Sequence, residues 1–320
     1  MVFHVVGDTG GFRDPDFQKR VPDAMASQYQ TSAVENKPSF LYHLGDVVYS
    51  HGEEKHYKSQ FFDPYANYPG PVFAIAGNHD SDINPGADKP YKSLDAFTAV
   101  FCDTEQRPVA FAGDSPRKSM VQPNIYWTLD TPLATIIGLH SNVPKYGIIT
   151  AEQRQWFLHE LLTSVQNHPE KALLVCIHHS PYSADVNHGS SLPMIEFLEG
   201  AFSETNVWPD MVFSGHVHNY QRINKRYPNG VTVPYIVAGA GGFDELHLVA
   251  HIDDERFSAE SEVLNGAELV YSCDTRHGFI KVTLERTDKG LSLDTEYYAI
   301  DGNGVALMDS YGKIVHALEK

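Results

Sequence analysis

Five segments of the chain run from a short apolar stretch directly into residues of the types that bind metal ions. In chain order they are FHVVGDTG, FLYHLGDVVY, VFAIAGNHD, LLVCIHH and MVFSGHVH. Such apolar runs predict buried strands, and ligands of α/β proteins gather at the carboxyl ends of strands. Because chance rarely repeats this arrangement so often, we expect the five strand ends to converge on one metal-binding crevice.

The remaining pattern predicts an α/β fold. Runs rich in β-branched and aromatic residues predict strands near 2–6, 39–44, 71–76, 125–130, 133–139, 172–177, 210–214, 233–237, 278–284 and 291–298. Helices are predicted over 94–101, 153–162 and 193–201, and Thr150 with Gln153 predicts a capping box before the second of them. Strands and helices alternate up to about residue 215 and mostly strands follow, which favours layered sheets flanked by helices.

The length of 320 residues allows a large core, and no Pro/Ser-rich linker or internal repeat divides the chain. We therefore expect a single domain over residues 1–320. Stretches rich in Gly, Pro, Asp and Ser at 81–123, 180–192 and 243–276 are interpreted as loop insertions that shape a substrate pocket.

The charge balance limits the partners. Lys and Arg number 24 against 41 Asp and Glu, a formal charge of −17 without a basic cluster. This composition argues against nucleic-acid polymers and anionic membranes, and no segment has the length of a membrane span. A small phosphorylated substrate is compatible, because clustered metal ions dominate the local field. Oligomeric state has no indication in the sequence.

The amino terminus, MVFHVVGDTG, is typical of a buried strand and follows neither a charged leader nor a long apolar segment. Cys102, Cys176 and Cys273 are odd in number and far apart, which suits small buried hydrophobes in a reducing compartment. We expect a cytoplasmic location if the chain is complete, and a secreted or periplasmic one if a leader was trimmed.

Asp46 is the pivot of the predicted metal site, because one carboxylate can bridge two hard cations through its separate oxygens. His216 and His218 lie two residues apart, so in extended chain both imidazoles point to the same side and can serve neighbouring ions. The other ligands then divide between the ions: Asp8 and His218 for one, and Asn78, His178 and His216 for the other.

Taken singly, several of these residues have structural interpretations. Asp8 could cap a turn and Tyr49 could pack in the core, but the surrounding set favours metal binding. Other residues are assigned outside the site. His4 and His43 are interpreted as core residues, His140 as a neighbour of the site at most, and Arg222 as a structural ion-pair partner.

The motifs GDTG, GDVVY, GNHD, VCIH and GHVHNYQR, in this order, resemble those of the calcineurin-like metallophosphoesterases. They resemble the purple acid phosphatase branch in particular, because Gly10 stands where most of the superfamily has His, and Tyr49 follows Asp46 by three residues. The resemblance implies a four-layer α/β/β/α sandwich. It also implies two ions: Fe(III) at Asp8, Asp46, Tyr49 and His218, and divalent Fe, Zn or Mn at Asp46, Asn78, His178 and His216.

Tyr49 supports iron on chemical grounds as well. A phenol, with an ordinary pKa of about 10, becomes a good ligand only when a strong Lewis acid removes its proton. Ferric iron does this, and the phenolate adds the negative charge that a trivalent ion favours.

The activity implied is hydrolysis of phosphate monoesters, in which two metal ions clamp the phosphate and lower the pKa of the attacking water. His79 would bond a phosphate oxygen or protonate the leaving alkoxide, and Asp80 would orient its imidazole or raise its pKa. His188 matches a second histidine of the family. His179, adjacent to a ligand on an extended chain, faces the opposite way.

Two alternatives remain from the sequence. A phosphodiesterase of the same fold would use two divalent ions such as Mn(II), with loops 81–123 and 243–276 deciding the room for the second ester group. The other is a non-catalytic, metal-stabilised scaffold for a protein partner. Such scaffolds usually lose ligands or the catalytic histidine, and this chain keeps both.

Overall fold

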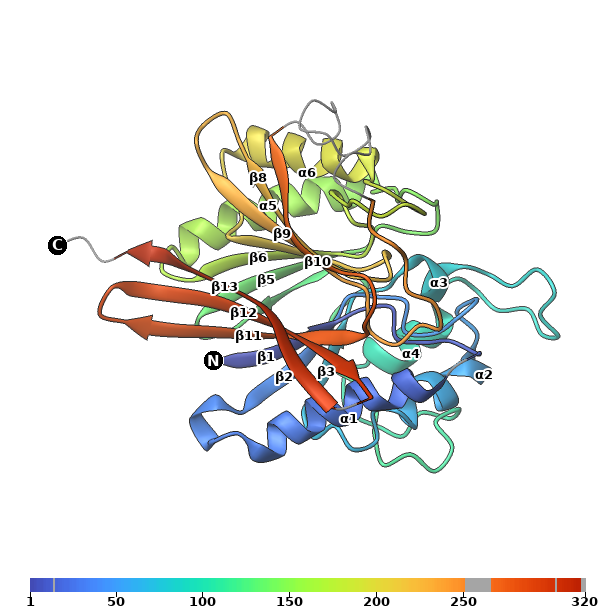
Figure 1. The fold of residues 1–320 in the computed structure, drawn as a ribbon. Coiled ribbons are helices and arrows are strands. Elements are labelled where there is room, and N and C mark those ends of the chain that lie inside the picture. Colours follow the sequence, from blue (N-terminus) through green and yellow to red (C-terminus); the bar gives the residue numbers. More distant parts are fainter. Residues whose placement is uncertain (14, 251–265, 303, 318–320) are drawn as a thin grey trace.

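The computed structural model describes residues 1–13, 15–250, 266–302 and 304–317. Two mixed sheets lie face to face between layers of helices (Figure 1). The first has the strand order β13-β12-β11-β1-β2-β3. Its strands are β1 (Val2–Val6), β2 (Pro38–His43), β3 (Val72–Ala74), β11 (Gly278–Thr287), β12 (Gly290–Asp301) and β13 (Gly304–Ala317).

The second sheet has the order β10-β8-β9-β7-β6-β5-β4. Its strands are β4 (Trp127–Asp130), β5 (Ala134–Leu139), β6 (Ala172–Ile177), β7 (Met211–Ser214), β8 (Tyr220–Arg226), β9 (Thr232–Ala238) and β10 (Ala267–Cys273). Strands β1, β2 and β3 run parallel in the first sheet, as do β5, β6, β7 and β9 in the second. Parallel strands end at one edge of a sheet, so each sheet offers several carboxyl ends side by side.

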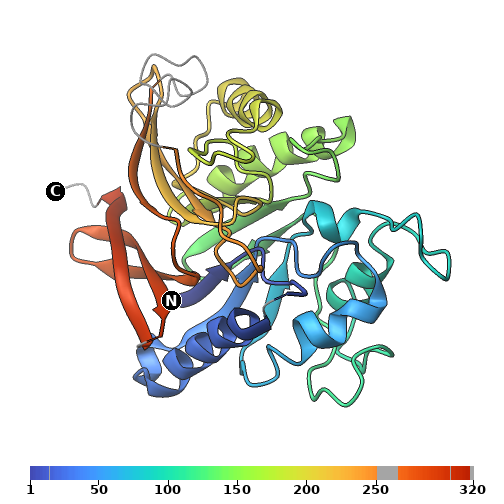
Figure 2. The ribbon, with the colours of Figure 1, turned by 45° about the vertical axis from the view of Figure 1, so that its right-hand side comes forward.

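Helices cover the outer faces of both sheets, as Figure 2 shows from a second direction. One side carries α1 (Pro15–Thr31), α2 (Glu54–Tyr57), the π-helical turn η2 (Lys58–Phe62) and α4 (Asp95–Phe101). The other carries α5 (Ala151–Asn167) and α6 (Leu192–Thr205). The short η1 (Val34–Asn36) precedes β2, and α3 (Asn78–Ser81) follows β3.

Alternation along the strands divides the core into layers. Val5 of β1 joins Leu174 and Phe213 in the cluster between the sheets, whereas the next residue, Val6, packs with Met25 of α1 on the outer face. This follows from the two-residue period of side chains along a strand. The predicted α/β/β/α sandwich is confirmed. None of the described helices is both long and apolar enough to cross a membrane.

The structure contains elements that the sequence analysis did not predict, among them four of the longer ones. Helix α1 and strands β8, β10 and β13 were not predicted. Strand β10 lies within the range 243–276 that we interpreted as a loop, and residues 251–265 of that range lie outside the described residues.

Candidate metal centre

The candidate ligands stand just beyond the carboxyl ends of parallel strands. They are Asp8 after β1, Asp46 after β2, Asn78 after β3, His178 after β6 and His216 after β7. Both sheets contribute, so the ligands meet where the two sheets adjoin. The cross-sheet hydrogen bond from His178 Nδ1 to the Leu44 carbonyl, 2.8 Å long, fixes this junction.

The backbone turns sharply at three of these residues. Asp8, Asp46 and His216 have φ values of 59°, 54° and 67°, which side chains other than glycine rarely adopt. Such conformations persist only where the surroundings enforce them, and they gather at functional sites. Here they aim consecutive strand ends at a common point. Gly77 must lack a side chain, because a Cβ there would lie 2.1 Å from Asp46 Oδ1.

One group of ligands surrounds the Tyr49 hydroxyl. Its oxygen lies 3.3 Å from Asp8 Oδ1 and 3.3 Å from His218 Nε2. The His218 Nδ1 donates to the Glu245 carbonyl at 3.2 Å, which leaves the lone pair of Nε2 facing the phenol and the carboxylate. All three side chains are buried.

A second group surrounds the Asn78 side-chain carbonyl. Its Oδ1 lies 3.1 Å from His178 Nε2 and 2.9 Å from His216 Nδ1. Asp46 Oδ2 lies 3.3 Å from His178 Nε2. The ligand atoms of Asp46, His178 and His216 all lie within 4.8 Å of one another, which makes them a possible metal-binding group.

The hydrogen bonding shows that this arrangement fits a cation. Because His178 Nδ1 donates to a carbonyl, a neutral His178 ring turns the lone pair of Nε2 toward Asp46 Oδ2 and Asn78 Oδ1, which are acceptors too. Buried acceptors facing one another are unfavourable unless a proton or metal ion lies between them. The carboxylate, amide and imidazole donors suit Fe and Zn.

Electrostatics point the same way. Burial and the Asp46 charge raise the pKa of Asp8 well above its usual range, although His178 opposes them. Burial lowers the pKa of His178, but the nearby Asp46 and Asp8 carboxylates raise it to a net value of about 9. The site therefore buries two carboxylates away from water, and a bound cation would favour the charged form of Asp8.

Gly10 and Gln60 hold Tyr49 in place. A Cβ on Gly10 would lie 2.9 Å from the Tyr49 ring, so the glycine of the first motif makes room for the phenol. Gln60, on the π-helical turn, accepts from the Tyr49 N–H at 2.8 Å and donates to the Tyr49 carbonyl at 3.0 Å. Its oxygen also accepts from the Gly11 N–H. Gln60 is a positioning residue that the sequence analysis missed.

His79 lines the cleft, and the neighbouring Asp80 bonds to backbone groups of the adjoining loops. His79 Nδ1 donates to the Ser50 carbonyl at 2.6 Å, which turns Nε2 away from that bond and fixes the tautomer. The Asp80 carboxylate accepts from the backbone N–H groups of Gly77, Val47 and Val48. Burial, with the Asp46 charge, raises the pKa of Asp80 to about 6. Through these hydrogen bonds Asp80 joins the loops that carry Asp46 and Asn78.

The structure brings His188 to the site. Its ring centroid lies 4.4 Å from that of His216, and its backbone N–H donates to Asp185 Oδ2 at 2.6 Å. The metal-facing cleft, about 280 Å³, contains most of the predicted side chains together with two unpredicted ones. It is lined by Asp46, Asn78, His79, Val143, Lys145, His188, His216 and His218.

Two further histidines lie behind the ligands. His247, missed by the sequence analysis, stacks on His218 with ring centroids 4.2 Å apart, and its backbone N–H donates to the His218 carbonyl. His179 is buried with its ring centroid 4.3 Å from that of His216, and its Nδ1 lies 2.7 Å from the Ser141 hydroxyl. His247 and Lys145 fall in loops without any motif, so only the folded structure reveals their position.

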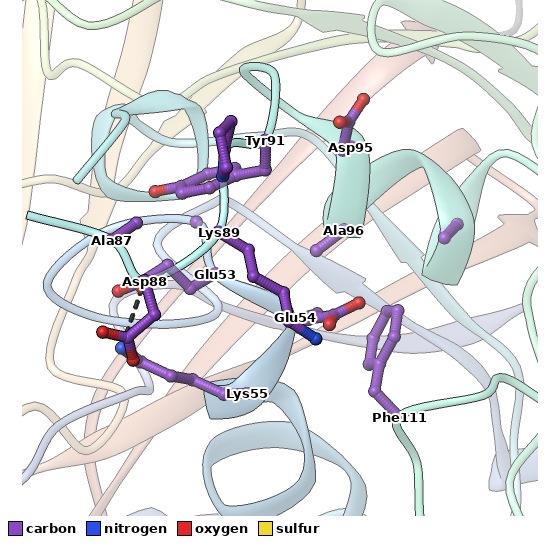
Figure 3. Close-up of a pocket in the computed structure, with 13 residues that line it drawn as sticks. Glu53, Glu54, Lys55, Ala87, Asp88, Lys89, Tyr91, Asp95, Ala96 and Phe111 are labelled. Atoms are coloured by element: carbon purple, nitrogen blue, oxygen red, sulfur yellow. Dashed lines mark ion pairs between the residues drawn. The ribbon is translucent and has the colours of Figure 1, made fainter. Parts of the chain in front are cut away.

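A different cavity, about 470 Å³, lies between the turn before α2 and helix α4 (Figure 3). Its wall contains an ion pair between Lys55 Nζ and Glu53 Oε1, 2.8 Å apart, together with the rings of Tyr91 and Phe111. None of the predicted metal ligands lines this cavity. The candidate metal site therefore lies in the smaller, metal-facing cleft and not in this cavity.

Comparisons with known proteins agree with this geometry. The family model of the calcineurin-like phosphoesterases matches residues 1–220. The chain belongs to this family. Fe(3+)-Zn(2+) purple acid phosphatase 12 of Arabidopsis thaliana is 25% identical over 320 residues, which cover 92% of this chain and 61% of the relative. Purple acid phosphatase 1 of Ipomoea batatas is 27% identical over 233 residues, 69% of this chain and 42% of the relative.

Among solved structures, the purple acid phosphatase PPD1 from yellow lupin (Lupinus luteus) seeds superposes with a TM-score of 0.64 at 18% identity. That match covers 98% of this chain and 53% of the lupin chain. The resemblance to the purple acid phosphatase branch is thus confirmed. This chain spans roughly half the length of the curated relatives that it matches.

Proposed function

We propose that this protein hydrolyses phosphate monoesters with an Fe(III) ion and a divalent ion. The observation that carries the proposal is the position of the Tyr49 hydroxyl, 3.3 Å from both Asp8 Oδ1 and His218 Nε2. Fe(III) would be held by Asp8, Asp46, Tyr49 and His218, and the divalent ion by Asp46, Asn78, His178 and His216. The Fe and Zn in the name of the Arabidopsis relative support this choice of metals.

The bound ions would supply Lewis acidity, which clamps phosphate oxygens and lowers the pKa of the attacking water. The protein provides the rest. His79, with its Nδ1 proton committed to the Ser50 carbonyl, presents Nε2 as the group that bonds or protonates the leaving oxygen. His188 also lines the cleft and would bond a phosphate oxygen.

The substitution Asp46→Asn tests the proposal. It removes the charge shared by both ions while keeping the shape of the side chain. We expect kcat/KM for 4-nitrophenyl phosphate to fall on the order of 10³-fold, because charge stabilisation in a water-excluded site depends on that carboxylate. Metal content should fall in the same samples. An unchanged rate of hydrolysis by Asp46→Asn would contradict the proposed metal-dependent function.

Matched monoester and diester substrates test the substrate class. We expect 4-nitrophenyl phosphate to be hydrolysed faster than bis(4-nitrophenyl) phosphate. A clear preference for the diester would favour a phosphodiesterase instead, and no hydrolysis across a broad panel by metal-loaded protein would favour a binding scaffold.

A further inference from the structure

A loop between β5 and α5, residues 141–148, forms one wall of the metal-facing cleft. Its ends are joined by the hydrogen bond from the Ile148 N–H to the Ser141 carbonyl, 2.8 Å long. Its tip is tied by the Ser191 hydroxyl, which donates to the Tyr146 carbonyl. Gly147 has a φ of 77°, and a Cβ there would lie 3.1 Å from His179 Nδ1. The loop is therefore held in one position over the cleft.

This loop places Lys145 at the mouth of the cleft. Among the described residues that line it, Lys145 is the only one with a permanent positive charge. The side chain is exposed, whereas the candidate ligands Asp46, His216 and His218 of the same cleft are buried. Among the described residues, Lys145 makes no ion pair, and its ammonium lies 5.3 Å from the centroid of the Tyr146 ring. The ammonium is therefore available to a ligand.

Lys145 differs from other exposed lysines, such as Lys289, because it lines the metal-facing cleft. The chain carries a formal charge of −17, yet no described carboxylate forms an ion pair with Lys145. The cleft below supplies its own partners for one phosphate group: the candidate metal ions, His79 and His188. A cation at the rim, above those partners, would meet a different part of the substrate. Val143 also lines the cleft and offers an apolar contact to the part of the substrate that joins the two anionic groups.

We propose that Lys145 is a specificity-determining residue that binds a second anionic group of the substrate. The preferred substrates would be phosphate monoesters that carry a further phosphate or carboxylate close to the scissile phosphate. This inference rests on the proposed phosphoesterase function and adds a substrate class to it. The flexible stem of lysine suits a point-charge contact at the rim, because its ammonium can follow anions of different geometry.

The test compares phenyl phosphate with 3-carboxyphenyl phosphate, which differ by one carboxylate. Lys145→Ala should raise KM for the carboxylated substrate about 5- to 10-fold, the size of one charge-assisted contact, and change KM for phenyl phosphate less than about twofold. Lys145→Arg should keep most of the discrimination. The effect should shrink as ionic strength rises, because the contact is exposed to solvent.

Lys289→Ala is the matched control, since Lys289 is an exposed lysine in the turn between β11 and β12. It should leave both substrates unaffected. Equal losses on both substrates in Lys145→Ala would mean that Lys145 binds the scissile phosphate, and no loss on either would make it an ordinary surface lysine. Both results would overturn the proposal.

Calorimetry separates this inference from the proposed function. If the metal-loaded wild-type protein hydrolyses neither substrate, the proposed function fails. The role of Lys145 is then tested by measuring how tightly the protein binds inorganic phosphate and pyrophosphate. Lys145→Ala should weaken binding of pyrophosphate about 5- to 10-fold and leave binding of phosphate within about twofold. Equal effects on the two anions, or none, would overturn the role of Lys145.

Discussion

The Asp-x-Gly form of the first motif is explained by a single side chain. Tyr49 fills the space over Gly10 where a larger residue would stand, with its hydroxyl between Asp8 and His218. One glycine and one tyrosine, 39 positions apart in the sequence, thus form a pair that, under the proposed function, would favour Fe(III). The motif comparison predicted both residues, but only the structure shows that the glycine accommodates the ring.

His79 gives a prediction at the same scale. If its Nε2 protonates the leaving oxygen, His79→Ala should lower kcat about 10²-fold or more for alkyl phosphates, which have poor leaving groups. The loss should be smaller for 4-nitrophenyl phosphate, whose leaving group needs little protonation. Steady-state rates across a series of leaving groups measure this difference.

His159→Ala is the control, because His159 is exposed on α5. It should not change the dependence of rate on leaving group. A uniform loss across the series in His79→Ala would contradict acid catalysis and would indicate that His79 only binds phosphate.

At the level of elements, the π-helical turn η2 positions Tyr49 through Gln60. It presents Gln60 to both backbone groups of Tyr49, and π-helical turns are frequent at functional sites. We expect Gln60→Ala to weaken binding of the iron about 10- to 100-fold, as is typical when a group that orients a metal ligand is removed. Metal titration with a chelating competitor measures this affinity.

The exposed neighbour Ser59 provides the control. Ser59→Ala removes only a hydroxyl that donates to the His56 carbonyl of the preceding helix α2, so iron affinity should stay at the wild-type value. If Gln60→Ala also binds iron normally, the turn has no role in positioning Tyr49.

Elements whose apolar pattern matches their burial could be predicted, and the others could not. Strand β5 is buried throughout and was predicted within one residue. Strand β8 was missed because its sequence, YQRINKR, is polar. It can be buried because Gln221 donates to Ser183 and Arg222 pairs with Asp309 at 2.8 Å. These partners lie 38 and 87 positions away, beyond the reach of any local pattern.

Contacts between residues far apart in the sequence also limited the prediction of helix starts and of the site. Thr150 caps α5 as predicted, since its side chain accepts from the Gln153 N–H at 3.2 Å. The reciprocal half of the predicted capping box is replaced, because the Gln153 side chain bonds both backbone groups of His140. The sequence motifs identified the candidate metal ligands, because most of them directly follow the carboxyl end of an apolar strand. Lys145 and His247 act through tertiary position alone.

At the scale of the whole molecule, metal binding and stability should be linked. Asp8 and Asp46 are fully buried side by side, so the metal-free fold bears a cost that bound ions would relieve. Ions present at 1,000 times their dissociation constant would stabilise the fold by about 4 kcal/mol. We expect a chelator to lower the melting temperature by several degrees, measured by scanning calorimetry. Asp46→Asn, with impaired metal binding, should respond much less to the chelator.

The metal-free protein should also lose stability as pH falls below about 6.5. Burial lowers the pKa of His4 and His140 to about 4 and that of His43 to about 3. The unfolded chain protonates these residues below the ordinary value of about 6.5, whereas the fold keeps them neutral, so unfolding takes up protons. Asp80, with a pKa of about 6, gains one proton in the fold and offsets part of the loss.

Urea unfolding at pH 8, 6.5 and 5 measures this dependence. The free energy of unfolding should drop between pH 6.5 and 5, where exposed carboxylates change little. A flat profile over that interval would show that these histidines are protonated in the fold.

The most direct test of the account is the visible absorption spectrum of the mildly oxidised protein, with its metals quantified on the same sample. We predict a ferric-tyrosinate charge-transfer band with about one iron and one divalent ion per chain. The band should disappear in Tyr49→Phe. A colourless wild-type protein that holds two divalent ions would contradict the iron site and favour a phosphodiesterase with two divalent ions.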